Sequence, residues 1–167
     1  MAGPDVIVVF AFGKFDNPEE EPNSHMAYYA ALFAKNWRVP ILTQCDIPIE
    51  PSPSLEVYFA EEKPEKYLST LGVAKSFASL AKEKGWRKIF VLAAPPHIRR
   101  CARDLRKLGF EVIKYDCFTK THCRHDGKMI IYNKKSTQWY TRAWYLWWLR
   151  ETPLRLVPWK KYEKITS

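Results

Sequence analysis

Residues 88–100 read KIFVLAAPPHIRR, and this stretch decides the fold. Its first seven residues are almost continuously apolar, which is typical of a strand buried on both faces. The helix that follows is predicted from an apolar stripe at Ile98, Cys101, Ala102, Leu105 and Leu108, with Gly109 as its stop. A buried strand that runs directly into an amphipathic helix is the repeating unit of a parallel α/β sheet.

The same alternation extends in both directions along the chain. Strands are predicted over residues 6–12, 39–43 and 110–115, the first of them as the central strand. Helices are predicted after a cap at Asn23 or Ser24, over 69–84, and as a short segment over 54–61. We therefore expect one α/β domain over 1–167, three-layer and Rossmann-like, with a mainly parallel sheet, helices on both faces and a core over 5–115.

The composition predicts a soluble, cytoplasmic protein. The chain has 167 residues, of which 47% are apolar, and this is enough to bury a core. No basic region precedes the first apolar run, and every hydrophobic block is shorter than the roughly 18 residues that cross a bilayer. Without an export signal we expect the four cysteines to be free thiols, with Cys45 and Cys101 as small buried hydrophobes.

The charge favours anionic partners. Lys and Arg number 27 against 18 Asp and Glu, which gives a formal net charge of +9. Such a balance suits phosphate-bearing ligands, nucleic acid or an acidic membrane surface. Charge alone does not choose among the three.

Ligands of open α/β sheets bind at the carboxyl ends of the strands, where helix N-termini also point their free N–H groups. That rule selects Gly13 with Lys14 after the first strand, residues 43–46 after the second, and residues 94–100 after the third. In the last segment His97 and Arg100 stand at the positive end of a helix, which favours an anion. We expect this corner to face an open crevice.

The sequence here resembles the YdcF-like and SanA-like proteins, a bacterial domain family associated with the cell envelope whose biochemistry is largely undefined. Residues 8–13, VVFAFG, resemble the family's strand that ends in Gly, and residues 66–113 follow its Thr-motif helix and its strand before a His-x-x-Arg sequence. Thr70, His97 and Arg100 match motif positions, and Ser69 stands beside the first of them.

The chain also departs from the family. Val73 stands where the family has Asn, Pro96 replaces an aromatic residue, and the segment that ends at Glu56 is a loose echo of its Ser-Glu-Ala segment. The chain thus resembles a shortened, divergent member over residues 5–115. The resemblance implies a Rossmann-like sheet with a small-molecule pocket for a nucleotide-like compound such as S-adenosylmethionine, and Glu56 joins the candidate ligand contacts on that basis.

Several candidates also have purely structural interpretations. Ser69 and Thr70 would serve equally well as a plain helix N-cap, and Gly13 supplies backbone freedom without forming a dinucleotide fingerprint. The polar loop before residue 128 contains metal-ligand side chains at Cys117, His122, Cys123, His125 and Asp126. Because their spacing matches no common zinc pattern, we predict a polar loop and no metal site.

The C-terminal part has a different character. A short strand over 129–132 and an aromatic helix over 137–150 are predicted, followed by a basic tail over 151–167 that lies across the surface. The spacing of aromatic positions 140, 144, 147 and 148 favours core packing or a homodimer contact. Stacking on nucleic acid or contact with an acidic membrane is the alternative interpretation.

Two function hypotheses follow. The first is a protein that binds a small anionic or nucleotide-like ligand, with Arg100 as the anion clamp and His97 as the acid or base of any reaction. No nucleophile is evident, so an enzymatic role stays open; a transferase or a hydrolase would fit such a substrate. The rival is a non-catalytic adaptor that docks on nucleic acid or acidic membrane through the basic, Trp-rich C-terminal region.

Overall fold

The computed structural model describes residues 3–13, 22–60, 69–114, 132, 134, 136 and 138–166. The predicted strand over 129–132 and the loop with Cys117, His122, Cys123 and His125 lie almost wholly outside these ranges, as does Lys14.

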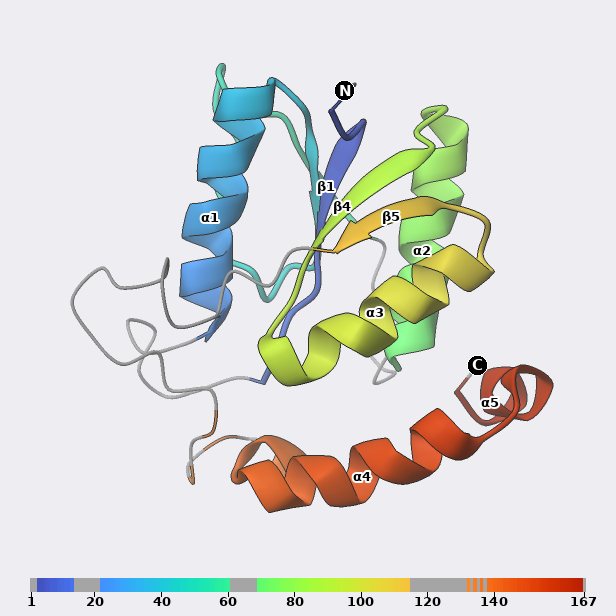
Figure 1. Cartoon of the computed structure of the whole chain (residues 1–167). Coiled ribbons are helices and arrows are strands. Elements are labelled where there is room, and N and C mark those ends of the chain that lie inside the picture. The colour runs from blue at the N-terminus through green and yellow to red at the C-terminus, as the bar shows by residue number, and fades with distance from the viewer. Residues whose placement is uncertain are drawn as a thin grey trace.

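The centre of the molecule is a five-stranded sheet whose strands are all parallel (Figure 1). Its spatial order is β3-β2-β1-β4-β5. The strands span Val6–Val9 (β1), Ile41–Thr43 (β2), Val57–Phe59 (β3), Lys88–Leu92 (β4) and Glu111–Lys114 (β5). The predicted Rossmann-like α/β class is confirmed, and β1 is central because its neighbours β2 and β4 leave in opposite directions.

Three helices complete the three layers. They span Pro22–Trp37 (α1), Thr70–Glu83 (α2) and Pro95–Lys107 (α3). Side chains alternate along β1: Val6 and Val8 belong to the core that includes α2 and α3, whereas Ile7 and Val9 belong to the core that includes α1. The sheet is therefore covered on both faces, as its uninterrupted apolar strands predict (Figure 1).

The predicted short helix over 54–61 is wrong. Residues 57–59 form β3, which pairs in parallel with β2 in the register Ile41↔Val57. A tight turn precedes it, since Ser52 and Leu55 exchange backbone hydrogen bonds of 3.2 and 2.9 Å. Val, Tyr and Phe favour strands, and the free edge of β2 offers them a backbone partner that local sequence does not reveal.

The C-terminal tail contains helices that were not predicted. A 3-10 turn over Trp139–Thr141 (η2) precedes α4, Trp144–Leu156, and α5, Trp159–Thr166, so the predicted helix over 137–150 starts later and continues into the tail. Tyr162 anchors α5: it is 1% exposed, and its hydroxyl donates to Oδ2 of Asp104 on α3 over 2.8 Å. A 3.0 Å ion pair between Lys75 of α2 and Glu163 adds to this contact.

The place of α4 matters for function. Figure 1 shows α4 lying across the carboxyl end of the sheet, below the point where α3 begins. Within the described residues, no helix combines the length and the apolar run that a membrane crossing needs.

Candidate functional site

The corner predicted from residues 94–100 forms as expected. β4 ends at Leu92, Ala94 caps α3, and the two prolines occupy the first helical positions, where a missing N–H costs nothing. The backbone N–H of His97 donates to the carbonyl of Ala94 over 2.8 Å. His97 and Arg100 are three residues apart on the helix, so they share one face, and both are buried.

His97 is enclosed by aromatic rings. Ring centroids of Phe10 and Phe12, which follow β1, lie 6.2 and 6.0 Å from the imidazole, and that of Trp147 on α4 lies 5.5 Å away. Burial, together with repulsion from the Arg100 guanidinium, lowers the pKa of His97 well below its ordinary value. The imidazole is therefore neutral at pH 7, which suits the 3.4 Å hydrogen bond that Nη2 of Arg100 donates to its Nδ1.

Arg100 forms a buried ion pair with α4. Its Nη1 lies 3.3 Å from Oε2 of Glu151, and the two side chains are 3% and 0% exposed. The guanidinium also lies 5.7 Å from the centroid of the Trp147 ring. A charge pair this deep is far less screened by solvent than one at the surface, and removing either partner would leave the other as an uncompensated buried charge.

Two buried donors in this cluster lack an acceptor. Across the described residues, neither Nε of Arg100 nor the indole N–H of Trp147 makes a hydrogen bond. Most buried donors in folded proteins are satisfied, by protein, by water or by a ligand. The cluster of His97, Arg100, Trp147 and Glu151 thus retains unused capacity to donate hydrogen bonds.

The expectation of an open crevice is wrong. His97 and Arg100 are brought together as predicted, but they are only 7% and 4% exposed because Trp147 and Glu151 of α4 cover them. Sequence reasoning missed Glu151 as a site residue. It is one of only two acidic residues after position 131, and an isolated acid in so basic a segment is a signal for a specific cationic partner.

Gly13 and Asn23 fix the backbone that follows β1. Gly13 has φ of 71°, a left-handed backbone conformation that glycine adopts without strain. The buried side chain of Asn23 holds residues 12 and 13: its Oδ1 accepts from the Phe12 N–H over 2.8 Å, and its Nδ2 donates to the Gly13 carbonyl over 3.0 Å. A cap at Asn23 or Ser24 was expected, but α1 already begins at Pro22, so both residues lie within the helix, and Asn23 makes tertiary contacts with residues 12 and 13.

Side chains at the end of β2 and in the loop after it also form hydrogen bonds to the backbone at the end of β1. Oε1 of Gln44 accepts from the Ala11 N–H over 3.0 Å, and the Thr43 hydroxyl donates to the Val9 carbonyl over 3.4 Å. These polar groups connect the carboxyl ends of β1 and β2. Cys101 is buried as expected, but Cys45, in this loop, is exposed because its turn faces solvent.

The structure places Glu56 away from the corner. Glu56 is exposed, accepts a hydrogen bond from the Tyr58 hydroxyl, and directly precedes β3. In a parallel sheet that position belongs to the amino edge, whereas His97 follows the carboxyl end of β4. Glu56 and His97 thus lie at opposite edges of the sheet.

Among the described residues, no group of three or more His, Cys, Asp or Glu side chains could hold a metal ion.

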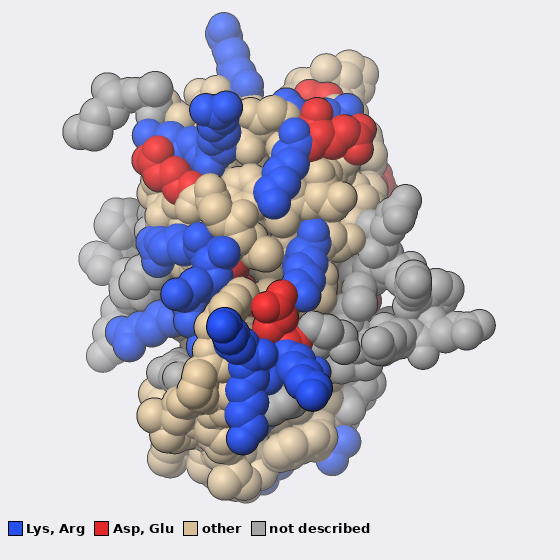
Figure 2. All heavy atoms as spheres, turned by 90° about the vertical axis from the view of Figure 1, so that its right-hand side faces the viewer, with Lys and Arg blue, Asp and Glu red and all other residues tan. Residues whose placement is uncertain are grey.

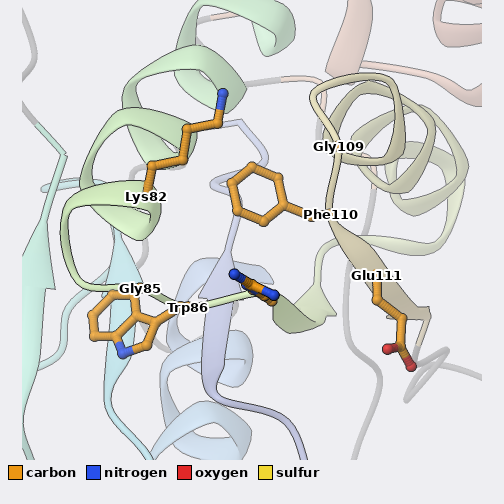
Figure 3. A pocket seen from close by; sticks show the side chains of 7 residues that line it. Lys82, Gly85, Trp86, Gly109, Phe110 and Glu111 are labelled. Carbon is orange, nitrogen blue, oxygen red and sulfur yellow. The ribbon is translucent and has the colours of Figure 1, made fainter.

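Two cavities formed by described residues lie away from the corner. One, of about 630 Å³, opens at the amino edge and is lined by Lys82, Gly85, Trp86, Arg87, Gly109, Phe110 and Glu111. Figure 3 shows Phe110 between the α2 side, with Lys82 and Trp86, and the β5 side, with Glu111. The other, of about 460 Å³, follows α1 and is lined by Ser24, Ala27, Tyr28, Ala31, Pro48, Ile49, Glu50 and Leu55.

Comparison with known proteins finds one similar solved structure and no family. No family model matches the chain, and no curated protein matches it. A solved structure with a similar arrangement is the pyrazinamidase of Pyrococcus horikoshii in complex with zinc, at 11% identity and a TM-score of 0.47. The match covers 66% of this chain and 83% of that one. The resemblance to YdcF-like proteins stays a prediction.

Ser69 is an N-cap of α2. Its hydroxyl accepts from the Gly72 N–H over 3.0 Å, and Thr70 is the first helical residue. Ser69→Ala is expected to lower the free energy of unfolding by about 1 kcal/mol in urea titrations, because one N–H loses its acceptor. Ser69→Asp keeps an acceptor and should retain stability. An unchanged midpoint in Ser69→Ala would show that the cap contributes nothing.

Proposed function

We propose that this protein binds a small anionic ligand at the carboxyl edge of its sheet, where α3 begins. The observation that carries the proposal is the pair of buried donors, Nε of Arg100 and the indole N–H of Trp147, that make no hydrogen bond within the described residues. Burying a donor without an acceptor costs free energy, and an anionic ligand would recover that cost. The N-terminus of α3 adds a positive helix dipole at the same corner.

Glu151 supports the proposal because a carboxylate already lies beside the guanidinium. Its Oε2 is 3.3 Å from Nη1 of Arg100, at a position where a ligand carboxylate or phosphate would pair equally well. In this interpretation Glu151 acts as an internal occupant of the anion site. A ligand that enters must take over the ion pair, and α4 must move far enough to let it reach Arg100.

The neutral imidazole of His97 gives the site its second function. With Nδ1 accepting from Arg100, Nε2 carries the proton and can donate to a ligand atom. For His97 to act as the acid or base of a transferase or hydrolase reaction, the bound ligand would have to draw Arg100 away from Nδ1, because this nitrogen is the only one that can accept a proton. The family resemblance extends the proposal to nucleotide-like ligands, with S-adenosylmethionine as one member of that class.

A ligand panel tests this site. Thermal unfolding is measured with inorganic phosphate, adenosine monophosphate and S-adenosylmethionine on the wild type and on Glu151→Gln, which keeps the shape but removes the competing charge. We expect at least one anion to raise the Tm of the wild type. Glu151→Gln should bind it roughly tenfold more tightly.

Two further variants separate binding from folding. Replacing both Arg100 and Glu151 by Leu removes the charge pair together, so the protein should fold while the ligand shift disappears. Arg99→Leu is the matched control, because Arg99 lies in the same helical turn but is exposed, and it should keep the shift. The proposal is wrong if no anion stabilises either the wild type or Glu151→Gln, or if the double Leu variant binds as well as the wild type.

A further inference from the structure

The outward face of α4 is apolar and exposed. Its large side chains at this face are Trp144, Tyr145, Trp148, Leu149 and Leu156, and the most exposed of them, Leu149 and Leu156, are 68% and 79% accessible. These positions follow helical spacing, so they form one stripe along the helix. The opposite side of the same helix carries the buried Trp147 and Glu151. The outward stripe is therefore not the face that α4 uses to pack on the domain.

The surroundings of this stripe are strongly basic. Residues 132–167 contain eight Lys or Arg and two acidic residues, Glu151 and Glu163. Both acids pair with cations outside this segment: Glu151 with Arg100 in the interior, and Glu163 with Lys75 at the surface. Exposed cations include Arg142 before α4 and Lys160, Lys161 and Lys164 on α5. Figure 2 shows Lys and Arg side chains spread over one face and extending onto its lower part, with fewer Asp and Glu side chains among them.

We propose that the outward face of α4 docks on an anionic membrane surface. Tryptophan and tyrosine prefer the boundary between headgroups and acyl chains, and leucine prefers the acyl chains. Lysine and arginine beside such a stripe gain free energy from acidic headgroups. α4 has 13 residues, too few to cross a bilayer, so it lies in the plane of the interface with its Trp147 side still on the domain.

The charge and chemistry of the stripe favour lipid over other partners. A second copy docked on the same face would bring two strongly basic segments together, which opposes association. Single-stranded RNA would stack its bases on the aromatic rings, but Leu149 and Leu156 offer no stacking surface. An acidic lipid surface satisfies the aromatic, aliphatic and basic side chains at once.

Vesicle co-sedimentation of the full chain tests the proposal. Vesicles of phosphatidylcholine, alone or with about 30% phosphatidylserine, are compared at about 0.1 M salt and at higher salt. We expect binding to the acidic vesicles that weakens as salt rises. Trp144→Gln with Leu149→Gln should weaken it roughly tenfold or more, because two apolar insertions are lost while helix propensity is kept.

Matched substitutions on another helix provide the control. Tyr28→Gln with Leu32→Gln also removes an exposed aromatic and an exposed leucine, four residues apart on α1, and should leave vesicle binding unchanged. Circular dichroism checks that both double variants are folded. The proposal is overturned if acidic vesicles do not bind the wild type, or if both double variants lose binding equally.

Two more outcomes would also overturn it and name the true partner. If the Trp144 and Leu149 substitutions abolish a dimer seen by light scattering and vesicles do not compete with that dimer, the stripe is a contact between copies. If single-stranded RNA displaces the protein from vesicles through this stripe and binds more tightly, the partner is nucleic acid. The proposal uses the outward face of α4 and stands or falls independently of the anion site on its inner side.

Discussion

Trp147→Ala is expected to lower the free energy of unfolding by about 3–5 kcal/mol. Trp147 is 1% exposed, and its ring centroid lies 4.9 Å from Phe12, 5.5 Å from His97 and 6.0 Å from Tyr140. Truncation would leave a large void between α4 and the carboxyl edge of the sheet. Those contacts connect α4 to the sheet, so the loss should also release α4 and expose His97 to solvent.

The measurement is equilibrium urea unfolding, followed by hydrogen exchange of α3 and α4. Trp144→Ala is the matched control: it removes the same side chain from the same helix at a site that is 64% exposed. Its cost should stay within about 0.5 kcal/mol. Equal costs for the two variants would mean that α4 is not docked on the corner in solution.

Glu151→Ala is the second substitution with a large expected effect, about 3–5 kcal/mol of lost stability. The reason is the partner left behind: Arg100, with a side chain 3% exposed, would keep a buried charge without its counter-ion. Arg100→Leu with Glu151→Leu should cost much less than Glu151→Ala alone, because both charges leave together. The coupling between the two positions is measured by a double-mutant cycle in urea.

A surface ion pair provides the comparison for the coupling measured between Arg100 and Glu151. Lys75 and Glu163 lie 3.0 Å apart, but their side chains are 39% and 42% exposed. Their coupling should be no more than about 1 kcal/mol, since water already solvates both charges. A Glu151→Ala variant as stable as the wild type would show that α4 does not hold this carboxylate against Arg100.

The elements of the α/β core could be predicted because their signals are local. The apolar run of β4, the stripe of α3 and the cap at Ser69 each depend on residues within a few positions of one another. Strand β3 could not be predicted in this way. Its three residues form a strand because they pair with β2, which lies before the tight turn at 52–55. Such pairing leaves no periodic signal in so short a segment.

Part of the candidate site could likewise be predicted from local sequence, and part could not. The rule that ligands bind at carboxyl edges placed His97 and Arg100 side by side from the sequence, since both lie in the first turns of one helix. The family resemblance added Glu56, and the structure places this residue at the opposite edge because it directly precedes β3, a strand that was not predicted. The cover over the corner was not predicted at all.

By itself the sequence determined the parallel α/β architecture, the helix start at the corner and the pairing of an imidazole with a guanidinium there. Only the tertiary structure decided whether that corner is open. Trp147 and Glu151 contact residues about fifty positions earlier in the chain, and contacts that distant depend on how whole helices pack. The same packing decides which side of α4 is buried and which side is left for a partner.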